Sequence, residues 1–306
     1  MADQHKKKTG SRGIEWCSTT INAFGGCMHD CKWKMADGTI AMCYAKSLAE
    51  TGVAKSAYPH GFEHHYFRPE ALKQLSAKKT PQLIFVDSMS DMFAHNVPED
   101  QLLQVFDEMR KAPQHVFQSL TKAAPQILKY LKHLPPNLWV GVSSPPDFMM
   151  GKELTERQQM QMLERSMEVL HVVREETGNI VWMSAEPISW DLTVVLNQLH
   201  PLDWIVIGAA SNGPKYFQPL AHDVCKLLEL MDATSTPVFF KGNIEATFLE
   251  NDFGTDALNR WREDFPTTYR DGTVIKAVQQ RQIDCDKYGW PKIGEDHPTQ
   301  LGRLFK

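Results

Sequence analysis

The sequence contains no long apolar run. Its most continuous hydrophobic stretches, such as residues 204–210, are far shorter than the roughly 18 to 20 residues that a membrane-spanning helix needs. No apolar segment follows the N-terminal lysines, as a secretory signal would require. We therefore expect a cytoplasmic protein without a membrane partner.

Cysteine and excess positive charge are also scarce. Six cysteines among 306 residues do not suggest a disulfide framework, and in a reducing cytosol thiols are available for metal binding or chemistry. The formal net charge of -4 argues against a protein that holds nucleic acid through a broad basic surface. A local basic groove is still compatible with this charge balance.

What the sequence does contain is an alternation of predicted strands and helices. Short, continuously apolar runs are typical of strands buried on both faces, and six of them lie at residues 82–87, 115–120, 138–142, 180–183, 204–207 and 237–240. Helical patterns lie between them, including one that opens at Pro125 and one that begins with the capping-box pair Thr155 and Gln158. This alternation predicts an α/β fold with a parallel sheet.

Polar residues follow almost every predicted strand, at the end where barrel enzymes build their active sites. We therefore expect a full or partial (β/α) barrel of the TIM-barrel type over residues 13–243, with its first strand within residues 13–22 and a cysteine loop at residues 27–43. Residues 1–12 are expected to form a mobile N-terminal tail. Residues 244–306 are expected to form a C-terminal extension packed on the barrel.

Three of the six cysteines lie within seventeen positions, at Cys27, Cys31 and Cys43. Thiolates at such spacing on a loop can converge on one metal centre. A structural zinc would need a fourth ligand, for which Cys17 or His29 would have to serve, whereas an iron–sulfur cluster held by three cysteines leaves one iron open. The residues alone leave both centres open.

A cysteine loop directly after the first strand of a parallel α/β barrel resembles the layout of the radical S-adenosylmethionine superfamily. Several segments of the chain resemble more closely a phage-associated family of three-cysteine proteins without an assigned function. They are I-E-W at 14–16, G-C at 26–27, C-Y-A at 43–45, D-S-M-S-D at 87–91, A-P-Q-H at 112–115, L-T-K at 120–122, V-G-V-S at 140–143, E-P at 186–187, D-W-I-V-I-G at 203–208 and F-F-K at 239–241. The superfamily pattern is C-x3-C-x2-C. The first gap matches here, but eleven residues, 32–42, occupy the second.

The resemblance implies a radical SAM-like barrel in which Cys27, Cys31 and Cys43 hold a 4Fe-4S cluster. The open iron would chelate S-adenosyl-L-methionine, and an electron from a donor such as flavodoxin or ferredoxin would release a 5'-deoxyadenosyl radical that acts on an unknown substrate. The polar residues expected to bind the cofactor are Asp87, Ser88, Ser90, Asp91 and Ser143. Strand capping by short polar side chains is the alternative for the residues of the 87–91 segment.

Three further residues are candidates for catalysis. Glu186 and Lys241 each follow a predicted strand closely, where they could contact S-adenosyl-L-methionine or the substrate, or form a structural ion pair. Cys17, expected at the mouth-facing end of the first strand, could donate a hydrogen atom to a substrate radical or could be a small buried apolar side chain.

Two classes of function follow. The first is an iron–sulfur enzyme that cleaves S-adenosyl-L-methionine, with a nucleic-acid base among the conceivable substrates. The second is a non-catalytic binding protein on the same fold, stabilised by zinc or an iron–sulfur cluster.

Overall fold

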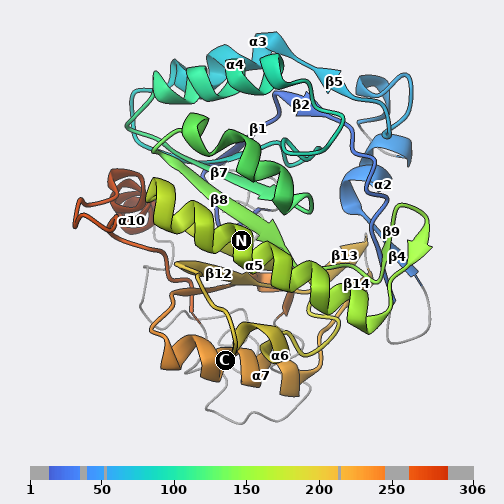
Figure 1. The fold of residues 1–306 in the computed structure, drawn as a ribbon. Coiled ribbons are helices and arrows are strands. Elements are labelled where there is room, and N and C mark those ends of the chain that lie inside the picture. The colour runs from blue at the N-terminus through green and yellow to red at the C-terminus, as the bar shows by residue number, and fades with distance from the viewer. Residues whose placement is uncertain (1–13, 35–39, 52–53, 213–214, 245–261, 289–306) are drawn as a thin grey trace.

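The computed structural model describes residues 14–34, 40–51, 54–212, 215–244 and 262–288, and its centre is a parallel sheet (Figure 1). Seven strands follow one another across this sheet in the order β1, β6, β7, β8, β11, β12 and β15, and all neighbours are parallel. Their bounds are Thr19–Ile21, Leu83–Val86, Val116–Thr121, Leu138–Ser143, Val181–Ala185, Trp204–Ile207 and Val238–Phe240. The six strands predicted from apolar runs are confirmed.

Helices connect the strands and cover the outer face of the sheet (Figure 1). The α-helices are α2 (Tyr44–Thr51), α3 (Pro69–Ala77), α4 (Glu99–Arg110), α5 (Glu156–Thr177), α6 (Thr193–Leu196), α7 (Ala221–Ala233) and α10 (Lys276–Tyr288). The 3₁₀ helices among the described residues are η1 (Lys55–Ala57), η2 (Ala124–His133) and η3 (Gly242–Ile244). The predicted capping box at Thr155 is confirmed by both of its hydrogen bonds. The helix expected at Pro125 is η2, which is wound as a 3₁₀ helix.

The sheet is an open barrel. In the part of the chain that the structure describes, β1 pairs with β6 and β15 pairs with β12, but β1 and β15 do not pair with each other. The predicted α/β fold is therefore confirmed in its partial-barrel form.

Two apolar layers hold this sheet from opposite sides. The outer layer packs the strands against the helices and contains such side chains as Phe106, Met167 and Leu228. The inner layer lies in the hollow of the barrel and contains four buried tryptophans, Trp16, Trp139, Trp182 and Trp204. Trp182 and Trp204 lie opposite each other in the register of β11 and β12, with ring centroids 4.9 Å apart. Such aromatic packing fills the barrel interior and stabilises the curved sheet.

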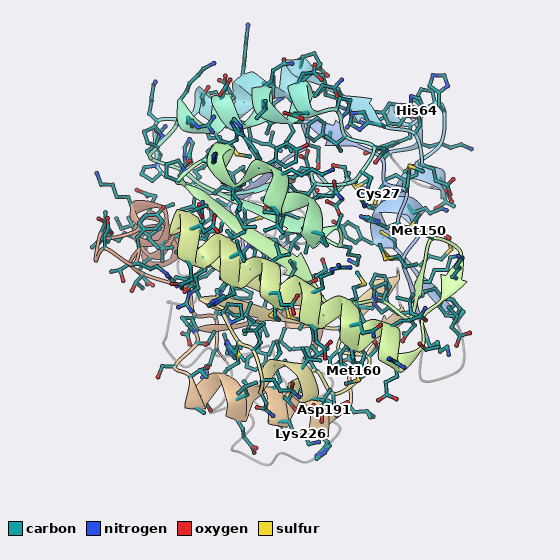
Figure 2. The ribbon with its side chains drawn as sticks, viewed as in Figure 1. Cys27, His64, Met150, Met160, Asp191 and Lys226 are labelled. Carbon is teal, nitrogen blue, oxygen red and sulfur yellow. The ribbon has the colours of Figure 1, made fainter. Side chains whose placement is uncertain are left out.

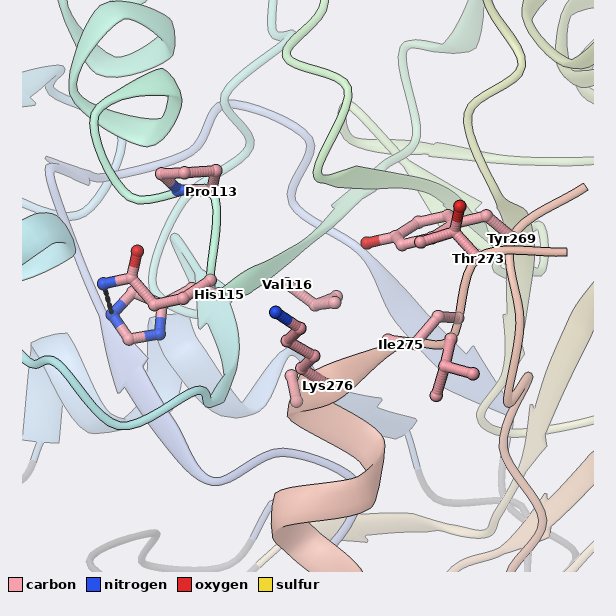
Figure 3. A pocket seen from close by; sticks show the side chains of 10 residues that line it. Pro113, His115, Val116, Tyr269, Thr273, Ile275 and Lys276 are labelled. Atoms are coloured by element: carbon pink, nitrogen blue, oxygen red, sulfur yellow. Dashed lines mark hydrogen bonds between the residues drawn. The ribbon is translucent and has the colours of Figure 1, made fainter. Parts of the chain in front are cut away.

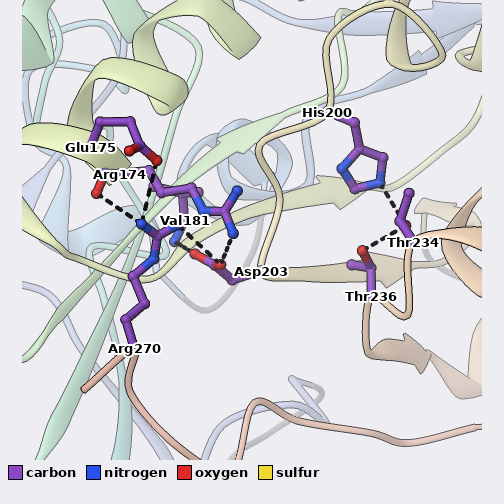
Figure 4. Close-up of polar contacts among 8 residues, drawn as sticks. All are labelled: Arg174, Glu175, Val181, His200, Asp203, Thr234, Thr236 and Arg270. Carbon is purple, nitrogen blue, oxygen red and sulfur yellow. Dashed lines mark hydrogen bonds and ion pairs between the residues drawn. The ribbon is translucent and has the colours of Figure 1, made fainter. Parts of the chain in front are cut away.

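The segment after residue 261 lies against the amino-terminal end of the barrel. Phe265 stacks on Trp204 with ring centroids 5.2 Å apart, and Arg270 contacts Glu175 at the end of α5 at 3.4 Å. Figure 4 shows Arg174 and Arg270 on either side of Asp203, whose carboxylate also accepts a hydrogen bond from the Val181 N–H at 2.9 Å.

A cavity of about 370 Å³ lies at the junction between this segment and the barrel. Figure 3 shows Pro113 and His115 on one side of it and Tyr269 and Ile275 on the other. The predicted tail at residues 1–12 lies outside the described residues, as does much of residues 244–306, so the domain boundaries stay predictions.

Smaller sheets gather at the opposite end, toward which the arrowhead of β8 points (Figure 1). One has four strands in the order β10 (Lys152–Glu153), β9 (Phe148–Met149), β3 (Lys32–Lys34) and β4 (Ile40–Met42). Two pairs, β2 (Phe24–Gly25) with β5 (Tyr66–Phe67) and β13 (Ala210–Asn212) with β14 (Lys215–Phe217), are the others. None of the described helices is both long and apolar enough to span a bilayer.

Candidate metal centre

The eleven residues between Cys31 and Cys43 contain a β-hairpin. Strand β3 pairs antiparallel with β4, with the first residue of β3 opposite the last residue of β4. The same register carried one position outward places Cys31 opposite Cys43, and the Cys43 N–H donates to the Cys31 carbonyl oxygen at 3.0 Å. Side chains directly opposite in such a pair share a face, with Cβ atoms about 4.5–5.5 Å apart. The hairpin therefore brings together two thiols that the sequence separates.

Cys27 is positioned by the residue before it. Gly26 forms a parallel bridge with Ser90, and the Cys27 N–H donates to the Phe62 carbonyl oxygen at 2.8 Å. Gly26 has a φ of 84°, and a Cβ atom there would lie 1.9 Å from the His64 carbonyl oxygen. Only glycine fits so close an approach, so the backbone at Cys27 is held between the end of β6 and the loop at residues 62–64.

The three cysteines form one group. Cys43 packs against two small apolar clusters, one of which also takes in Cys27 while the other contains Cys31. Burial raises the pKa of the Cys31 thiol to about 12 and the pKa of Cys27 well above its ordinary value. Negative charge on Cys31 and on Cys43 raises the pKa of Cys27 further.

Among the described residues, no three Cys, His, Asp or Glu side chains already stand in a geometry that could hold a metal ion. The donor set nevertheless suits a metal, because burial disfavours the thiolate form of two of the cysteines and a metal cation reverses that preference.

Asp91 ties the cysteine loop to the barrel. His29, between the first two cysteines, has its Nε2 atom 2.7 Å from Asp91 Oδ2. The same oxygen accepts hydrogen bonds from the Thr121 hydroxyl and the Lys122 N–H, both at 2.9 Å. Burial opposes the charged form, but His29 and these hydrogen bonds lower the pKa of Asp91 below its ordinary value. Asp91 therefore fastens the loop to the end of β7, and its predicted contact with a cofactor stays a prediction.

The other polar residues of the 87–91 segment have mixed surroundings. Asp87 turns back to accept a hydrogen bond from the Phe24 N–H at 2.8 Å. The Ser88 hydroxyl donates to Asn22 Oδ1 at 3.2 Å. Ser90 has a buried Oγ atom without a hydrogen-bond partner among the described residues. Asp87 and Ser88 thus hold neighbouring backbone and loop atoms, while Asp87 Oδ2 and Ser90 Oγ are buried atoms without a hydrogen-bond partner among the described residues.

Asp87 leads to a prediction about pH. Burial raises the pKa of its carboxyl from an ordinary value of 3.8 to about 8. The unfolded chain therefore releases this proton first, and each pH unit between about 4 and about 8 should lower the free energy of unfolding by about 1.4 kcal/mol. Asp87→Asn removes this titration, so urea unfolding measured across that range should show a flatter decline in the variant. Equal slopes for the two proteins would contradict the assignment.

Glu186 and Lys241 form an ion pair at the carboxyl ends of β11 and β15. Lys241 Nζ lies 3.0 Å from Glu186 Oε1, and the two side chains are 19% and 13% exposed. The Ser184 hydroxyl donates to Glu186 Oε2 at 2.8 Å. A Cβ atom at Gly208 would lie 2.8 Å from Glu186 Oε1, so the glycine leaves room for the carboxylate. Burial opposes the charged form of Lys241, but Glu186 raises its pKa.

Other side chains join this end of the sheet. Ser143 ends β8 and lies opposite Ser184 in β11. Tyr44, to which the sequence analysis gave no role, donates its hydroxyl to the Ser88 carbonyl oxygen at 2.5 Å, and burial together with the charge of Cys43 raises its pKa. One indication of this position was present in the sequence, because Tyr44 directly follows the candidate ligand Cys43.

Glu15 is a second residue that the sequence analysis gave no role. Its Oε2 atom accepts a hydrogen bond from the Gly242 N–H at 2.6 Å, next to Lys241. Because 227 positions separate the two partners, no local pattern indicates this contact. Glu15 therefore adds a second carboxylate near the ion pair.

Cys17 does not lie where the sequence analysis expected it. Strand β1 begins at Thr19, so Cys17 precedes the strand instead of ending it at the barrel mouth. Its side chain is 2% exposed and packs in the inner layer beside Trp16. The Cys17 Sγ atom donates to the Ile14 carbonyl oxygen at 3.7 Å. This environment suits a small apolar side chain, and a role in hydrogen-atom transfer stays a prediction.

Solved structures with a similar fold include spore photoproduct lyase complexed with dinucleoside spore photoproduct. It is 11% identical, with 91% of this chain and 75% of that chain covered and a TM-score of 0.43. A point mutant of the same lyase is 9% identical, with 76% and 78% covered and a TM-score of 0.46. A double mutant with bound AdoMet and dinucleoside spore photoproduct is 11% identical, with 90% and 74% covered and a TM-score of 0.41.

Sequence comparison gives the family. No curated protein matches the chain. A family model described as "Protein of unknown function (DUF5131)" matches residues 11–260, which include the three cysteines and every strand of the central sheet. The chain therefore belongs to the DUF5131 family.

Proposed function

We propose that Cys27, Cys31 and Cys43 hold a 4Fe-4S cluster and that the protein is an enzyme that reductively cleaves S-adenosyl-L-methionine. The hairpin carries this proposal, because it places Cys31 and Cys43 opposite each other despite the eleven residues between them. When bound, such a cluster supplies the electron that converts S-adenosyl-L-methionine into a 5'-deoxyadenosyl radical.

The surroundings of the cysteines support this assignment. The loop is fastened on both sides, by Asp91 at His29 and by the pairing of Gly26 with Ser90, so the thiols are presented from a fixed backbone. The unpartnered Ser90 hydroxyl lies beside this loop and is available to a polar group of the cofactor. Glu186 and Lys241 offer one charge of each sign at the same end of the sheet, which matches the amino and carboxylate groups of S-adenosyl-L-methionine.

The substrate, the electron donor and the cellular setting belong to the proposal as well. A nucleic-acid base is the substrate class that we carry forward, with a flavodoxin or ferredoxin as donor. The phage association and the cytoplasmic location implied by the sequence remain expectations. Each is secondary to the question of which metal the cysteines bind.

The test is reconstitution without oxygen. Protein purified and loaded with iron and sulfide under anaerobic conditions should contain four irons per chain, as three cysteines and one open site imply. After reduction with dithionite, it should convert S-adenosyl-L-methionine to 5'-deoxyadenosine, measured by liquid chromatography. A protein that takes up zinc alone and forms no 5'-deoxyadenosine would overturn the proposal.

One observation favours a second candidate, a structural zinc site that includes His29. Histidines that bind zinc commonly hold a carboxylate with their other ring nitrogen, and His29 Nε2 is paired with Asp91. Three thiolates and His29 would close a tetrahedral site and leave no open position. The protein would then be a metal-stabilised binding protein, in which chelation lowers thermal stability and no turnover exists to be lost.

A further inference from the structure

A groove lies on the rim of the barrel beside the cysteine loop. Its volume is about 530 Å³, within the range of about 300–1,000 Å³ typical of small-molecule sites. Met28 and His29 of the cysteine loop form one wall, and residues 161–166 of α5 contribute to its lining. Figure 2 shows Met150, another lining residue, at the same end of the molecule as Cys27.

Methionines give this groove its apolar surface. Met28, Met149, Met150 and Met162 reach it from three different parts of the chain. Met28 is 50% exposed and Met150 is 64% exposed, although burial would be favourable for both. Thioether side chains are flexible and polarizable, and they make favourable contacts with aromatic rings. The groove therefore suits a flat aromatic group.

The charged side chains of the groove have one sign. Lys122 and Arg165 line it, whereas none of its described lining residues is an aspartate or glutamate. Lys122 Nζ lies over the Trp33 ring of β3, 5.7 Å from its centroid, so the ammonium group lies beside the hairpin. Arg165 stands on the exposed face of α5. Two cations over an apolar floor favour a ligand that joins an anionic group to an aromatic ring.

We propose that this groove binds a nucleotide, with the base against the methionines and the phosphate between Lys122 and Arg165. A base joined to a phosphate could be supplied by a free mononucleotide or by one nucleotide of a single-stranded nucleic acid. The proposal deepens the nucleic-acid substrate class proposed above and rests on it in that respect. It does not depend on the proposed cluster, because none of the four methionines and neither cation is a proposed metal ligand.

The test is equilibrium dialysis of the metal-loaded protein with thymidine 5'-monophosphate, whose pyrimidine base does not imitate the adenine of S-adenosyl-L-methionine. Thymidine, inorganic phosphate and a single-stranded oligothymidylate serve as comparison ligands. Thymidine 5'-monophosphate should bind saturably, and thymidine and inorganic phosphate should each bind at least about tenfold more weakly, because each lacks half of the recognised group. Tighter binding of oligothymidylate, weakened by salt, would identify a single strand as the source.

Variants locate the binding. Arg165→Gln and Lys122→Gln should each weaken binding of the monophosphate about tenfold, and Met150→Ser about threefold. Arg157→Gln is the matched control, since Arg157 is an exposed arginine of the same helix that does not line the groove. No saturable binding of either nucleotide form, equal affinity for inorganic phosphate, or equal loss in the control would overturn the proposal. Because dialysis needs no turnover, failure to cleave S-adenosyl-L-methionine leaves this result unaffected.

Discussion

Cys43→Ser should yield a folded protein that binds no 4Fe-4S cluster and forms no 5'-deoxyadenosine. The substitution replaces a soft thiolate ligand by a hydroxyl that stays protonated at neutral pH, and with two cysteines left the cluster has too few ligands. Because the Cys43 N–H keeps its bond to the Cys31 carbonyl oxygen, the hairpin should persist. Iron content, the absorption of the reconstituted protein and product formation measure the effect.

Cys225→Ser is the control for this experiment. Cys225 lies on α7, far along the chain from the cysteine loop, and the same chemical change there should leave iron content and product formation unaltered. Cys31→Ser should reproduce the loss, since the two cysteines share one cross-strand position. Full iron content in Cys43→Ser, or equal losses in Cys225→Ser, would show that the hairpin does not carry the centre.

The second large effect is expected at the ion pair. Lys241→Met leaves the Glu186 carboxylate without its partner at a site where that carboxylate is 13% exposed. Removing one partner of a buried pair typically costs about 3–5 kcal/mol, because the remaining charge is not compensated. Urea unfolding of the apoprotein should therefore show a much lower midpoint for Lys241→Met than for the wild type.

A double variant separates stability from function. Glu186→Leu combined with Lys241→Met removes both charges, and the free energy of unfolding should return to within about 1–2 kcal/mol of the wild type. If the pair also contacts S-adenosyl-L-methionine, this stable double variant should still fail to bind it in a calorimetric titration. A single variant as stable as the wild type would mean that the pair is not coupled in solution.

The central sheet could be predicted from the sequence, because strands buried on both faces are continuously apolar and need no partner to be recognised. Trp204–Ile207 shows this, since its bounds agree in sequence and structure. The first strand could not be placed in the same way. Strand β1 has only three residues, two of them threonines, and the apolar residue before it, Trp16, fills the barrel interior. For this reason Cys17 was expected at the mouth-facing end of the first strand, although it precedes that strand.

The candidate site could be predicted only in part. The cysteines and the polar residues after the strands were identified from their chemistry and their order along the chain. Their partners were not, because the contacts join distant positions: His29 and Asp91 are 62 residues apart. Strands β3 and β4, of three residues each, are too short to give a period, so the gap between Cys31 and Cys43 could not be recognised as a hairpin.

The hairpin also affects how related sequences should be searched for, because the number of residues between Cys31 and Cys43 need not be fixed. A pattern with a fixed number of residues between the second and third cysteines would miss this chain, although Cys31 and Cys43 lie opposite each other across the hairpin. The register is preserved when β3 and β4 gain or lose the same number of residues, because Cys31 then stays opposite Cys43. One extra residue in only one strand would turn one of the two thiols to the other face of the hairpin. A search that allows the interval to vary and asks for strand-forming residues on both sides should find further relatives.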